Sequence, residues 1–259
     1  MPAAYDTYDY PSYWTKRGYE HKAEVYALRR LLDAVPKVQK VLEIGAGYGR
    51  LIPVYKSKGE KIIISDPSAK LLKIARKNNK SNKIQFIQST LENLDKNIAP
   101  KSIDLVIIVR VLHHLKDPQE SIKAVSKIIK PNGYLILEYA NKIHFKANVA
   151  EFLKGNITYT HDIFFKDVKS SNLLHKSLPF YNFHPDKVEH MLFCANFKVL
   201  KKRSVSNIRS PYIKKVISSD SLMVMEKPLQ VILSKLDFGP SMFILAKRKK
   251  VITDYLTTP

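Results

Sequence analysis

Cysteine is nearly absent from this chain of 259 residues, in which Cys194 stands alone. A single cysteine cannot form an internal disulfide, so we expect a protein of a reducing, cytoplasmic compartment. Long apolar runs are lacking as well. The longest, residues 105–109, ends at Arg110 and is far shorter than the roughly 18 residues that cross a bilayer. The first residues are aromatic and acidic, so we expect neither a secretory signal nor a transmembrane segment.

Motifs of several common chemistries are missing too. The chain has no internal repeat, no low-complexity tract and no local Ser/His/Asp arrangement. Cys194 lies on an apolar face of an expected helix, which indicates a buried thiol rather than a nucleophile. The scattered histidines lack the spacing of metal ligands, so we expect no metal at His161, His175, His184 or His190.

Acidic side chains are scarce, since 23 Asp and Glu stand against 44 Lys and Arg and give a formal net charge of +21. Such a charge suggests binding to nucleic acid. However, 35 of the basic residues are Lys and nine are Arg, and they are spread along the chain. Arg is the residue that reads phosphate and guanine through two-point contacts. We therefore favour a solvated basic surface over a nucleic-acid footprint, and an attraction to anionic substrates or membranes stays open.

The sequence is rich, by contrast, in short apolar strands that alternate with helices. Residues 105–109 are apolar throughout, which is typical of a strand buried on both faces. The alternation predicts an α/β fold on a mostly parallel sheet with right-handed crossovers. Strands are predicted at 41–44, 61–64, 84–87, 104–109, 134–138, 197–203 and 242–246, and helices at 20–35, 51–56, 69–77, 119–129 and 186–194.

Two regions stand apart from this alternation. Residues 1–36 combine a tyrosine-rich segment with a cap helix, and we expect residues 37–259 to form the main domain. Within that domain, residues 142–184 show no clear period but carry many aromatic side chains, which predicts a loop-rich insertion. Two interpretations of the insertion stay open: a lid over a binding site, or a small satellite core under a surface excursion.

A glycine-rich turn gives the most informative local pattern. Gly45, Gly47 and Gly49 follow the first strand and open a helix, so backbone N–H groups there can face a ligand without an intervening side chain. Their spacing differs from the G-x-G-x-x-G of a dinucleotide-binding turn. Glu43 precedes the turn, and Asp66 ends the next strand, where a carboxylate can accept both hydroxyls of a ribose. A tight turn without a ligand is the alternative.

Four segments together resemble the class I S-adenosylmethionine (SAM)-dependent methyltransferases. These are VLEIGAGYGRL at 41–51, the strand end at Asp66, IDLVIIVRVLHHLKDP at 103–118 and IIKPNGYLILEYAN at 128–141. Within that class the chain is similar to the type 11 group, which includes ubiquinone and menaquinone methylases. The resemblance implies a Rossmann-like, seven-stranded, mostly parallel sheet with an antiparallel last strand and helices on both faces. It also implies SAM as cofactor and S-adenosylhomocysteine as product.

The resemblance assigns cofactor-binding roles by position. It places the ribose on Asp66, with Pro67 beside the adenine and Val109 at the edge of the same site. The family often has an acid after the third strand that contacts the adenine amino group. Here Thr90 stands at that position, so adenine binding is left to backbone groups of Thr90 and Leu91. The methionine part of SAM falls to residues in and around the glycine turn, namely Glu43, Gly45, Ala46, Gly47, Tyr48 and Arg50.

Candidate catalytic residues follow the fourth strand, at the edge of the sheet where ligands of open α/β folds bind. We expect His113 to face the pocket as a base and His114 to cap the next turn, although a structural role for either histidine stays open. Arg110 either binds an anionic substrate or pairs with an acid such as Glu138. The acceptor pocket is assigned to Tyr10, Trp14, Arg110 and Asn141.

The predicted function is transfer of a methyl group from SAM to a small or amphiphilic acceptor. Such a reaction asks little of side chains, because the sulfonium is an activated donor and the enzyme must mainly align a nucleophile in a dry pocket. Two alternatives remain. One is an RNA methyltransferase that uses the lysine clusters, and the other is a non-catalytic SAM-fold subunit that binds a partner.

Overall fold

A seven-stranded sheet with the order β3-β2-β1-β4-β5-β9-β8 forms the centre of the computed structural model, which describes residue 6 and residues 9–168 and 180–250. β9 runs antiparallel to β5 and β8, and the other neighbouring strands are parallel. The predicted sheet with an antiparallel last strand is confirmed. The strands are β1 (Val38–Ile44), β2 (Gly59–Asp66), β3 (Ile84–Gln88), β4 (Ile103–Ile108), β5 (Ile129–Ala140), β8 (Phe197–Val205) and β9 (Ser241–Arg248).

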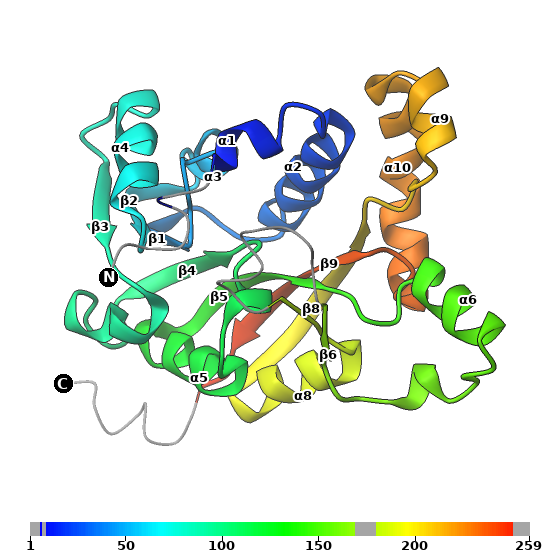
Figure 1. The fold of residues 1–259 in the computed structure, drawn as a ribbon. Helices are drawn as coiled ribbons and strands as arrows, with labels where there is room; N and C mark the ends of the chain where they lie inside the picture. Colours follow the sequence, from blue (N-terminus) through cyan, green and yellow to red (C-terminus); the bar gives the residue numbers. More distant parts are fainter. Residues whose placement is uncertain (1–5, 7–8, 169–179, 251–259) are drawn as a thin grey trace.

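Helices cover both faces of the sheet because the side chains of its central strands alternate between them. In β4, Leu105 and Ile107 pack into one buried cluster, and Val106 and Ile108 pack into the other. Figure 1 shows the two groups of helices on opposite sides of the sheet. The first cluster includes α2 (Gly18–Leu32), α3 (Ile52–Tyr55), α4 (Ala69–Asn78) and α10 (Ser219–Ile232), and the second includes α5 (Pro118–Ile128) and α8 (Pro185–Cys194).

Local signals in the sequence explain where two of these helices begin. The side chain of Ser68 accepts a hydrogen bond from the backbone N–H of Leu71 and caps α4. Asp117 caps α5 in the same way, and Pro118 takes the first helical position, where no intrahelical bond is lost. Both caps lie near the carboxyl edge of the sheet, so they help to fix the loops that follow β2 and β4.

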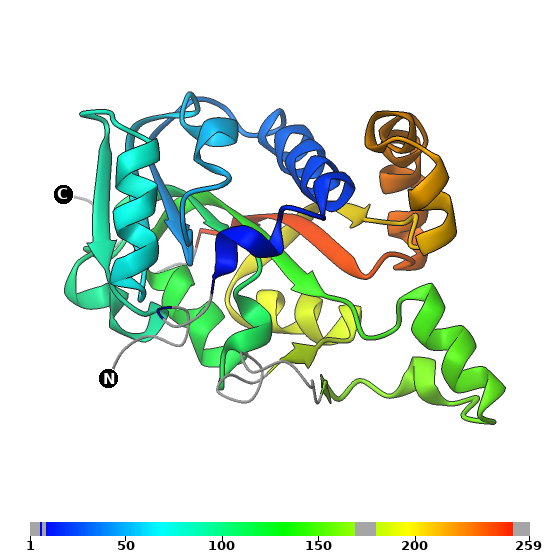
Figure 2. The ribbon, with the colours of Figure 1, turned by 45° about the horizontal axis from the view of Figure 1, so that its top comes forward.

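The aromatic N-terminal segment lies across the carboxyl edge of the sheet (Figure 2). It contains α1 (Tyr10–Tyr13) and leads into α2. The Trp14 side chain is 8% exposed and stacks on Arg50, whose guanidinium carbon lies 3.7 Å from the ring centroid. Tyr5 and Tyr8 of the same segment lie outside the described residues. The described aromatic side chains thus pack close to the glycine turn.

The insertion at 142–184 combines loops with a helix that was not predicted. Its described parts are α6 (Phe145–Leu153), η4 (Tyr159–His161) and the two-stranded ribbon of β6 (Lys166–Asp167) and β7 (Tyr181–Asn182), while 169–179 lie outside the described residues. Phe145, Val149 and Phe152 recur with a helical period but stay exposed instead of joining the core. In both ribbon views α6 lies at the opposite end of the sheet from β3 and α4 (Figures 1 and 2).

Two further features of the second half differ from expectation. Pro228 lies inside α10, where no helix was predicted, and the short helix α9 (Pro211–Val216) precedes it. Cys194 is exposed, which corrects the prediction of a buried thiol. The reason is that α8 turns Val188 and Leu192 toward the sheet and leaves Cys194 on the solvent side.

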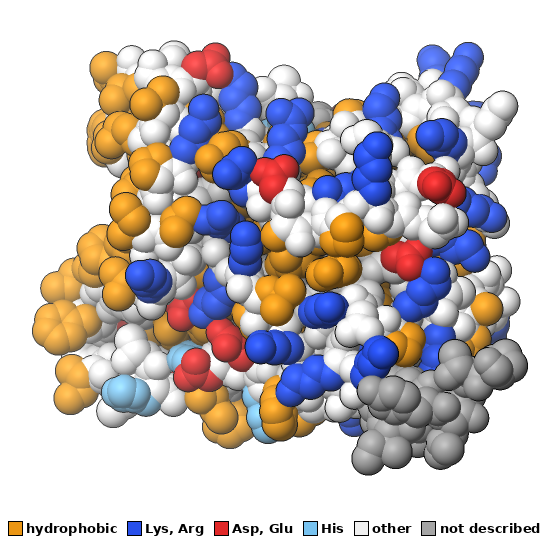
Figure 3. All heavy atoms as spheres, turned by 180° about the vertical axis from the view of Figure 1, so that it is seen from behind, with side chains coloured by type: hydrophobic (Ala, Val, Ile, Leu, Met, Phe, Trp, Pro, Cys, Tyr) orange, Lys and Arg blue, Asp and Glu red, His pale blue; other side chains and the backbone are white. Residues whose placement is uncertain are grey.

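Basic side chains are spread over the surface. On the face seen from behind, Lys and Arg are distributed widely among apolar side chains, with few acids, rather than gathered into one stripe (Figure 3). Some are paired within the chain, as Lys22 is with Asp220 and Lys202 with Glu189. Among the described helices, none is both long and apolar enough to span a membrane.

Candidate functional site

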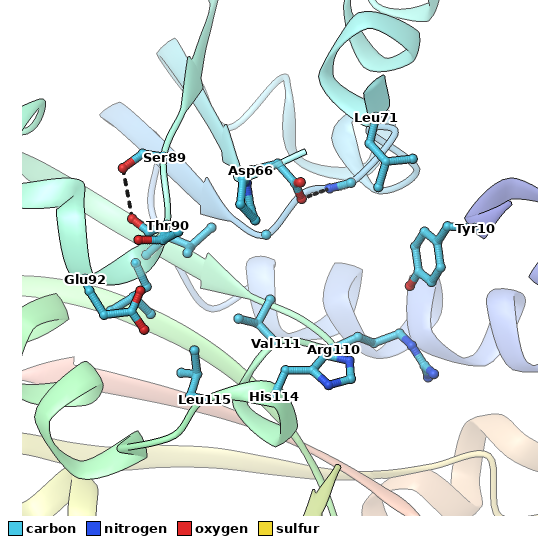
Figure 4. A pocket seen from close by; sticks show the side chains of 15 residues that line it. Tyr10, Asp66, Leu71, Ser89, Thr90, Glu92, Arg110, Val111, His114 and Leu115 are labelled. Atoms are coloured by element: carbon cyan, nitrogen blue, oxygen red, sulfur yellow. Dashed lines mark hydrogen bonds between the residues drawn. The ribbon is translucent and has the colours of Figure 1, made fainter. Parts of the chain in front are cut away.

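The carboxyl ends of β1, β2, β3 and β4 surround a cavity of about 300 Å³, which we call cavity one (Figure 4). Open α/β sheets bind ligands at this edge. The cavity is lined by Tyr10, Ile44, Gly45, Gly47, Asp66, Pro67, Leu71, Ser89, Thr90, Leu91, Glu92, Arg110, Val111, His114 and Leu115. It therefore brings together the glycine turn, the ends of the next three strands and the N-terminal segment.

The glycine turn requires glycine for two physical reasons. Gly45 has a φ of +70°, and a Cβ there would lie 2.2 Å from Cγ2 of Val111. Gly47 has a φ of +56°, which is its reason for being glycine, since a Cβ there would make only an ordinary contact with the ring of Tyr10 at 3.5 Å. Left-handed backbone is unfavourable for residues with a side chain. The turn thus keeps the backbone bare between Tyr10 and Val111, where a ligand can approach it closely.

Asp66 lies in cavity one at the end of β2 and holds the glycine turn in place. Its Oδ2 accepts a hydrogen bond from the N–H of Gly47 at 2.7 Å (Figure 4). Its Oδ1 accepts one from the N–H of Ser68 at 2.8 Å. Burial raises the pKa of Asp66 to about 6, although the two N–H donors oppose the rise. Each carboxylate oxygen keeps a second lone pair, so the group can also accept from the hydroxyls of a ribose.

The far end of cavity one carries an acid that sequence reasoning missed. Thr90 lines the cavity at the predicted position, and Glu92 lines it two residues later, in the first turn of η2 (Leu91–Lys96). In Figure 4, Glu92 and Thr90 stand at one end of the cavity and Tyr10 and Arg110 at the other. The sequence does contain a signal for this acid, because Glu92 follows the expected position, Thr90, by two residues. Glu92 suits an amino group, and Asp66 between the two ends suits a ribose, so the residues fit a nucleoside.

The remaining predicted cofactor residues lie outside the wall of cavity one. Glu43 is buried beneath the turn and accepts a hydrogen bond from the hydroxyl of Tyr55. Burial raises the pKa of Glu43 to about 7, against the effects of Tyr55 and Arg50. The guanidinium of Arg50 forms an ion pair with Glu24, with 2.5 Å between Nη2 and Oε2. Because strand side chains alternate, Glu43 faces α3 rather than the ligand, and Val109 packs in the same core cluster as α3.

Two residues that flank the glycines, Ala46 and Tyr48, are also engaged within the chain. Ala46 donates its backbone N–H to the carbonyl of Ser65 at 3.1 Å, which uses the group predicted to face the ligand. The ring of Tyr48 packs edge-on against Tyr10, with 5.9 Å between ring centroids. Ala46 and Tyr48 therefore shape the turn and the aromatic cover, and neither belongs to the cavity wall.

Arg110 lies where cavity one meets a second cavity. Its φ of +62° is a left-handed conformation that costs a non-glycine residue roughly 1–2 kcal/mol. Its N–H donates to Glu138 at 2.7 Å, while its guanidinium donates to Glu24 at 3.3 Å and to the Tyr13 hydroxyl at 2.9 Å. The ion-pair partner is thus Glu24 and not Glu138, because the side chain extends toward α2. Burial is the largest single influence and lowers the pKa of the Arg110 guanidinium, but Glu24, Tyr10, Tyr13 and Glu138 together raise that pKa above its ordinary value.

The second cavity, cavity two, also has a volume of about 300 Å³. Arg110 belongs to the walls of both cavities, so they adjoin there. Cavity two is lined by Tyr13, Trp14, Arg17, Glu20, Glu24, Arg110, His113, Glu138, Ala140, Asn141, His144, Val168, Phe180, Asn182, Ser206, Arg209, Lys214, Pro240 and Ser241. Aromatic rings and charged groups thus share this wall.

The two candidate catalytic histidines line different cavities. His113, which is 3% exposed, lines cavity two, and His114 lines cavity one. Phe180 packs against both rings, with centroid distances of 4.4 Å to His113 and 5.7 Å to His114. The ring of His114 thus belongs to a cavity wall, as the ring of His113 does.

The predicted acceptor residues are divided between the cavities. Tyr10 lines cavity one, while Trp14 and Asn141 line cavity two. The Asn141 amide is already used within the chain: its nitrogen donates to the carbonyls of Asp237 and Gly239, and its oxygen accepts from the N–H of Ile143. Asn141 therefore holds the loop before β9 and also belongs to the wall of cavity two.

No group of three or more His, Cys, Asp or Glu side chains within the described residues is arranged to hold a metal ion. His184 has a structural role, because its Nδ1 accepts a hydrogen bond from the N–H of Asp186 at 3.2 Å at the start of α8. His190 lies 3.5 Å from Sγ of Cys194 on the same helix. His175 lies outside the described residues.

Comparison with known proteins gives matches to methyltransferases. Residues 42–137 match a family model described as a methyltransferase domain. A ubiquinone biosynthesis O-methyltransferase of Vibrio atlanticus is 33% identical over 107 residues, 40% of this chain and 44% of that protein. The enzyme of the same name in Rickettsia conorii is 30% identical over 151 residues, 55% of this chain and 50% of its own. The chain thus spans about half the length of these curated relatives.

Solved structures share the fold over nearly the whole chain. A SAM-dependent methyltransferase from Archaeoglobus fulgidus matches with a TM-score of 0.56 at 19% identity, covering 93% of this chain and 100% of that one. One from Mesorhizobium loti has a TM-score of 0.58 at 14% identity, covering 86% and 98%. These likenesses concern the fold, and the family match concerns the sequence around the glycine turn. Residues 42–137 thus resemble a methyltransferase domain, and the chain as a whole shares the fold of solved SAM-dependent methyltransferases.

Proposed function

We propose that the chain transfers the methyl group of SAM, bound in cavity one, to a small or amphiphilic molecule bound in cavity two. The observation that carries this proposal is the junction of the two cavities at Arg110. A donor and an acceptor in adjoining cavities can meet without crossing bulk water, which favours alignment of the reacting atoms.

The polar groups of cavity one suggest an orientation for the cofactor. Glu92 would accept from the adenine amino group and Asp66 from the ribose hydroxyls. Tyr10 and Arg110, at the other end of the cavity (Figure 4), would face the methionine part. This direction points the reactive end at cavity two. When bound, SAM supplies an activated methyl group: a lone pair of the acceptor forms the bond to the methyl carbon, the C–S bond breaks, and its electron pair stays on sulfur to give S-adenosylhomocysteine.

His113 is the proposed base. A hydroxyl acceptor must lose its proton as the new bond forms, and His113 lies in the wall of cavity two beside the junction. Phe180 packs on its ring and excludes water from one side. The curated relatives bear the name O-methyltransferase, which supports an oxygen acceptor for this site.

The test is incubation of the protein with methyl-labelled SAM and a cell extract separated into RNA, protein, lipid and small-molecule fractions. We expect label in the small-molecule or lipid fraction. Label in RNA would overturn the proposal in favour of an RNA methyltransferase. Absence of label, together with calorimetric binding of neither SAM nor S-adenosylhomocysteine, would favour a non-catalytic subunit.

A further inference from the structure

The charged groups of cavity two are not balanced within the chain. Each carboxylate in its wall has a partner: Glu20 pairs with Lys214, and Glu24 receives the guanidinium of Arg110. Glu138 accepts the N–H of Arg110 and the hydroxyl of Ser241. In the described ranges, all acids of this wall are therefore engaged.

Arg17 and Arg209 line the same cavity from opposite ends of the sequence, and among the described residues neither forms an ion pair with a carboxylate. Arg17 stacks on the ring of Tyr13, with its guanidinium carbon 4.1 Å from the centroid. Desolvation by surrounding residues lowers the pKa of Arg209, and the nearby charge of Arg17 lowers it further against the effect of Glu20. Both arginines are exposed and belong to the wall of cavity two. An anion bound between two guanidiniums would reduce the repulsion between their like charges.

His144 adds a neutral donor to this wall. Its Nδ1 accepts the N–H of Ala147 at the start of α6, so a neutral ring carries its proton on Nε2. Burial lowers the pKa of His144 to about 4, and Arg209 is the next cause of the shift. The ring is therefore neutral at physiological pH, and its Nε2–H can donate to an anion without adding charge.

We propose that cavity two selects a methyl acceptor that carries an anionic group, a carboxylate or a phosphate, which Arg17 and Arg209 bind. The inference rests on the proposed function, since it names the substrate class of that site. Guanidiniums bind both kinds of anion through paired N–H donors. The rings of Tyr13, Trp14 and Phe180 supply an apolar wall in the same cavity. The acceptor is accordingly a molecule with an apolar or aromatic body and an anionic end, with the body toward His113.

The test uses three small probes of similar shape: benzoate, phenyl phosphate and the neutral benzamide. Each is titrated into the protein with and without S-adenosylhomocysteine, and the fluorescence of Trp14, the single tryptophan of the chain, reports occupancy of cavity two. We expect at least one anion to bind about tenfold or more tightly than benzamide. Whichever of benzoate and phenyl phosphate binds more tightly indicates whether the anionic group of the acceptor is a carboxylate or a phosphate.

The double substitution Arg17→Gln with Arg209→Gln should weaken anion binding about tenfold or more and leave benzamide binding unchanged. Arg29→Gln is the matched control, because Arg29 is exposed on α2 and lines neither cavity. Benzamide binding as tightly as both anions, or unchanged anion binding in the double variant, would overturn the inference. If the double variant unfolds at a lower temperature than the unmodified chain, the comparison of benzoate, phenyl phosphate and benzamide on the unmodified chain still tests the inference.

Calorimetry with S-adenosylhomocysteine separates the two proposals. An anion that binds while S-adenosylhomocysteine does not would leave the anion site standing and remove the methyltransferase assignment. If S-adenosylhomocysteine bound but the anions bound no more tightly than benzamide, the methyltransferase assignment would stand and the anion site would be overturned.

Discussion

The imidazole rings of His113 and His114 lie 4.1 Å apart, centroid to centroid, yet they line different cavities. Both residues belong to the short 3₁₀ helix η3 (Leu112–His114). With three residues per turn, successive side chains of such a helix diverge by about 120°. This local geometry places the two neighbouring histidines in the walls of different cavities.

Replacement of His113 is expected to affect the reaction and not the cofactor. His113→Ala should lower the rate of methyl transfer about 10²- to 10⁴-fold, as the loss of a general base does, while affinity for SAM stays unchanged. His114→Ala should weaken SAM binding instead. Rates are measured with the acceptor fraction identified by labelling, and affinities by calorimetry. His190→Ala, on the exposed side of α8, is the control. Loss of SAM affinity in His113→Ala, with turnover per bound SAM preserved, would contradict the assignment.

Asp66 predicts a pH dependence of cofactor binding. The carboxylate accepts ribose hydroxyls best when ionised, and burial raises its pKa to about 6. SAM affinity should therefore fall as pH decreases through about 6, approaching tenfold per pH unit below it. In the absence of ligand, the pH dependence of folding stability that Asp66 causes has the opposite sign, so stability falls as pH rises. Because the pKa of Asp66 is raised on folding, its contribution to stability is fully present below the unfolded pKa of about 4 and is lost as pH rises through about 6.

Asp66→Asn is the matched variant for this dependence. It keeps the size of the side chain but removes the titration, so we expect weaker SAM binding with no inflection near pH 6. Calorimetric titrations from pH 5 to pH 8 measure both chains. An inflection that persists in Asp66→Asn would assign the titration to another group, such as Glu43, whose pKa burial raises to about 7.

Glu92 is expected to recognise the adenine amino group. Glu92→Gln exchanges a pure acceptor for a mixed donor and acceptor, so S-adenosylhomocysteine should bind about tenfold more weakly. S-inosylhomocysteine, which has an oxygen in place of that amino group, should not lose affinity. Asp95→Asn is the control, since Asp95 is exposed on the same short helix and does not line the cavity. If Glu92→Gln lowered the affinity for S-adenosylhomocysteine and S-inosylhomocysteine equally, Glu92 would not recognise the adenine amino group.

The sequence predicted those features that depend on neighbours in the chain. Residues 105–109 indicate a buried strand by composition alone, and the glycine turn is legible because its backbone conformation requires glycine at fixed positions. The pairing of Arg110 with Glu24 could not be predicted, because 86 residues separate them and only the packing of α2 brings them together. Glu92 was not predicted for a related reason. The conformation of η2, which the sequence pattern does not reveal, determines that the side chain of Glu92 reaches the cavity.

Gly45 offers a test of the close packing at the turn. Gly45→Ala combines a left-handed φ with a Cβ at 2.2 Å from Cγ2 of Val111, so we expect a loss of roughly 2–4 kcal/mol in the free energy of unfolding. Gly155→Ala isolates the backbone contribution, because Gly155 has a φ of +81° and nothing within 4 Å of its Cβ. That variant should lose about 1 kcal/mol. Urea denaturation measures both.

A double-mutant cycle adds a second control for Gly45. Val111→Ala removes the overlapping methyl group, so Gly45→Ala should be less destabilising in its presence than alone. If Gly45→Ala and Gly155→Ala cost the same, or if Val111→Ala brings no relief, the overlap with Val111 is not what excludes a side chain at this position.

Replacement of Glu24 is expected to be strongly destabilising, because this carboxylate pairs with two arginines. Its side chain is 3% exposed and lies 2.5 Å from Arg50 and 3.3 Å from Arg110. Glu24→Gln leaves both guanidiniums without a charged partner in a mostly buried site, which should cost about 3–5 kcal/mol in the free energy of unfolding. Glu20→Gln is the control from the same helix: its pair with Lys214 is more exposed and should contribute less than about 1 kcal/mol. Urea denaturation distinguishes the two, and similar losses for both variants would mean that Arg50 and Arg110 find other partners when Glu24 is neutralised.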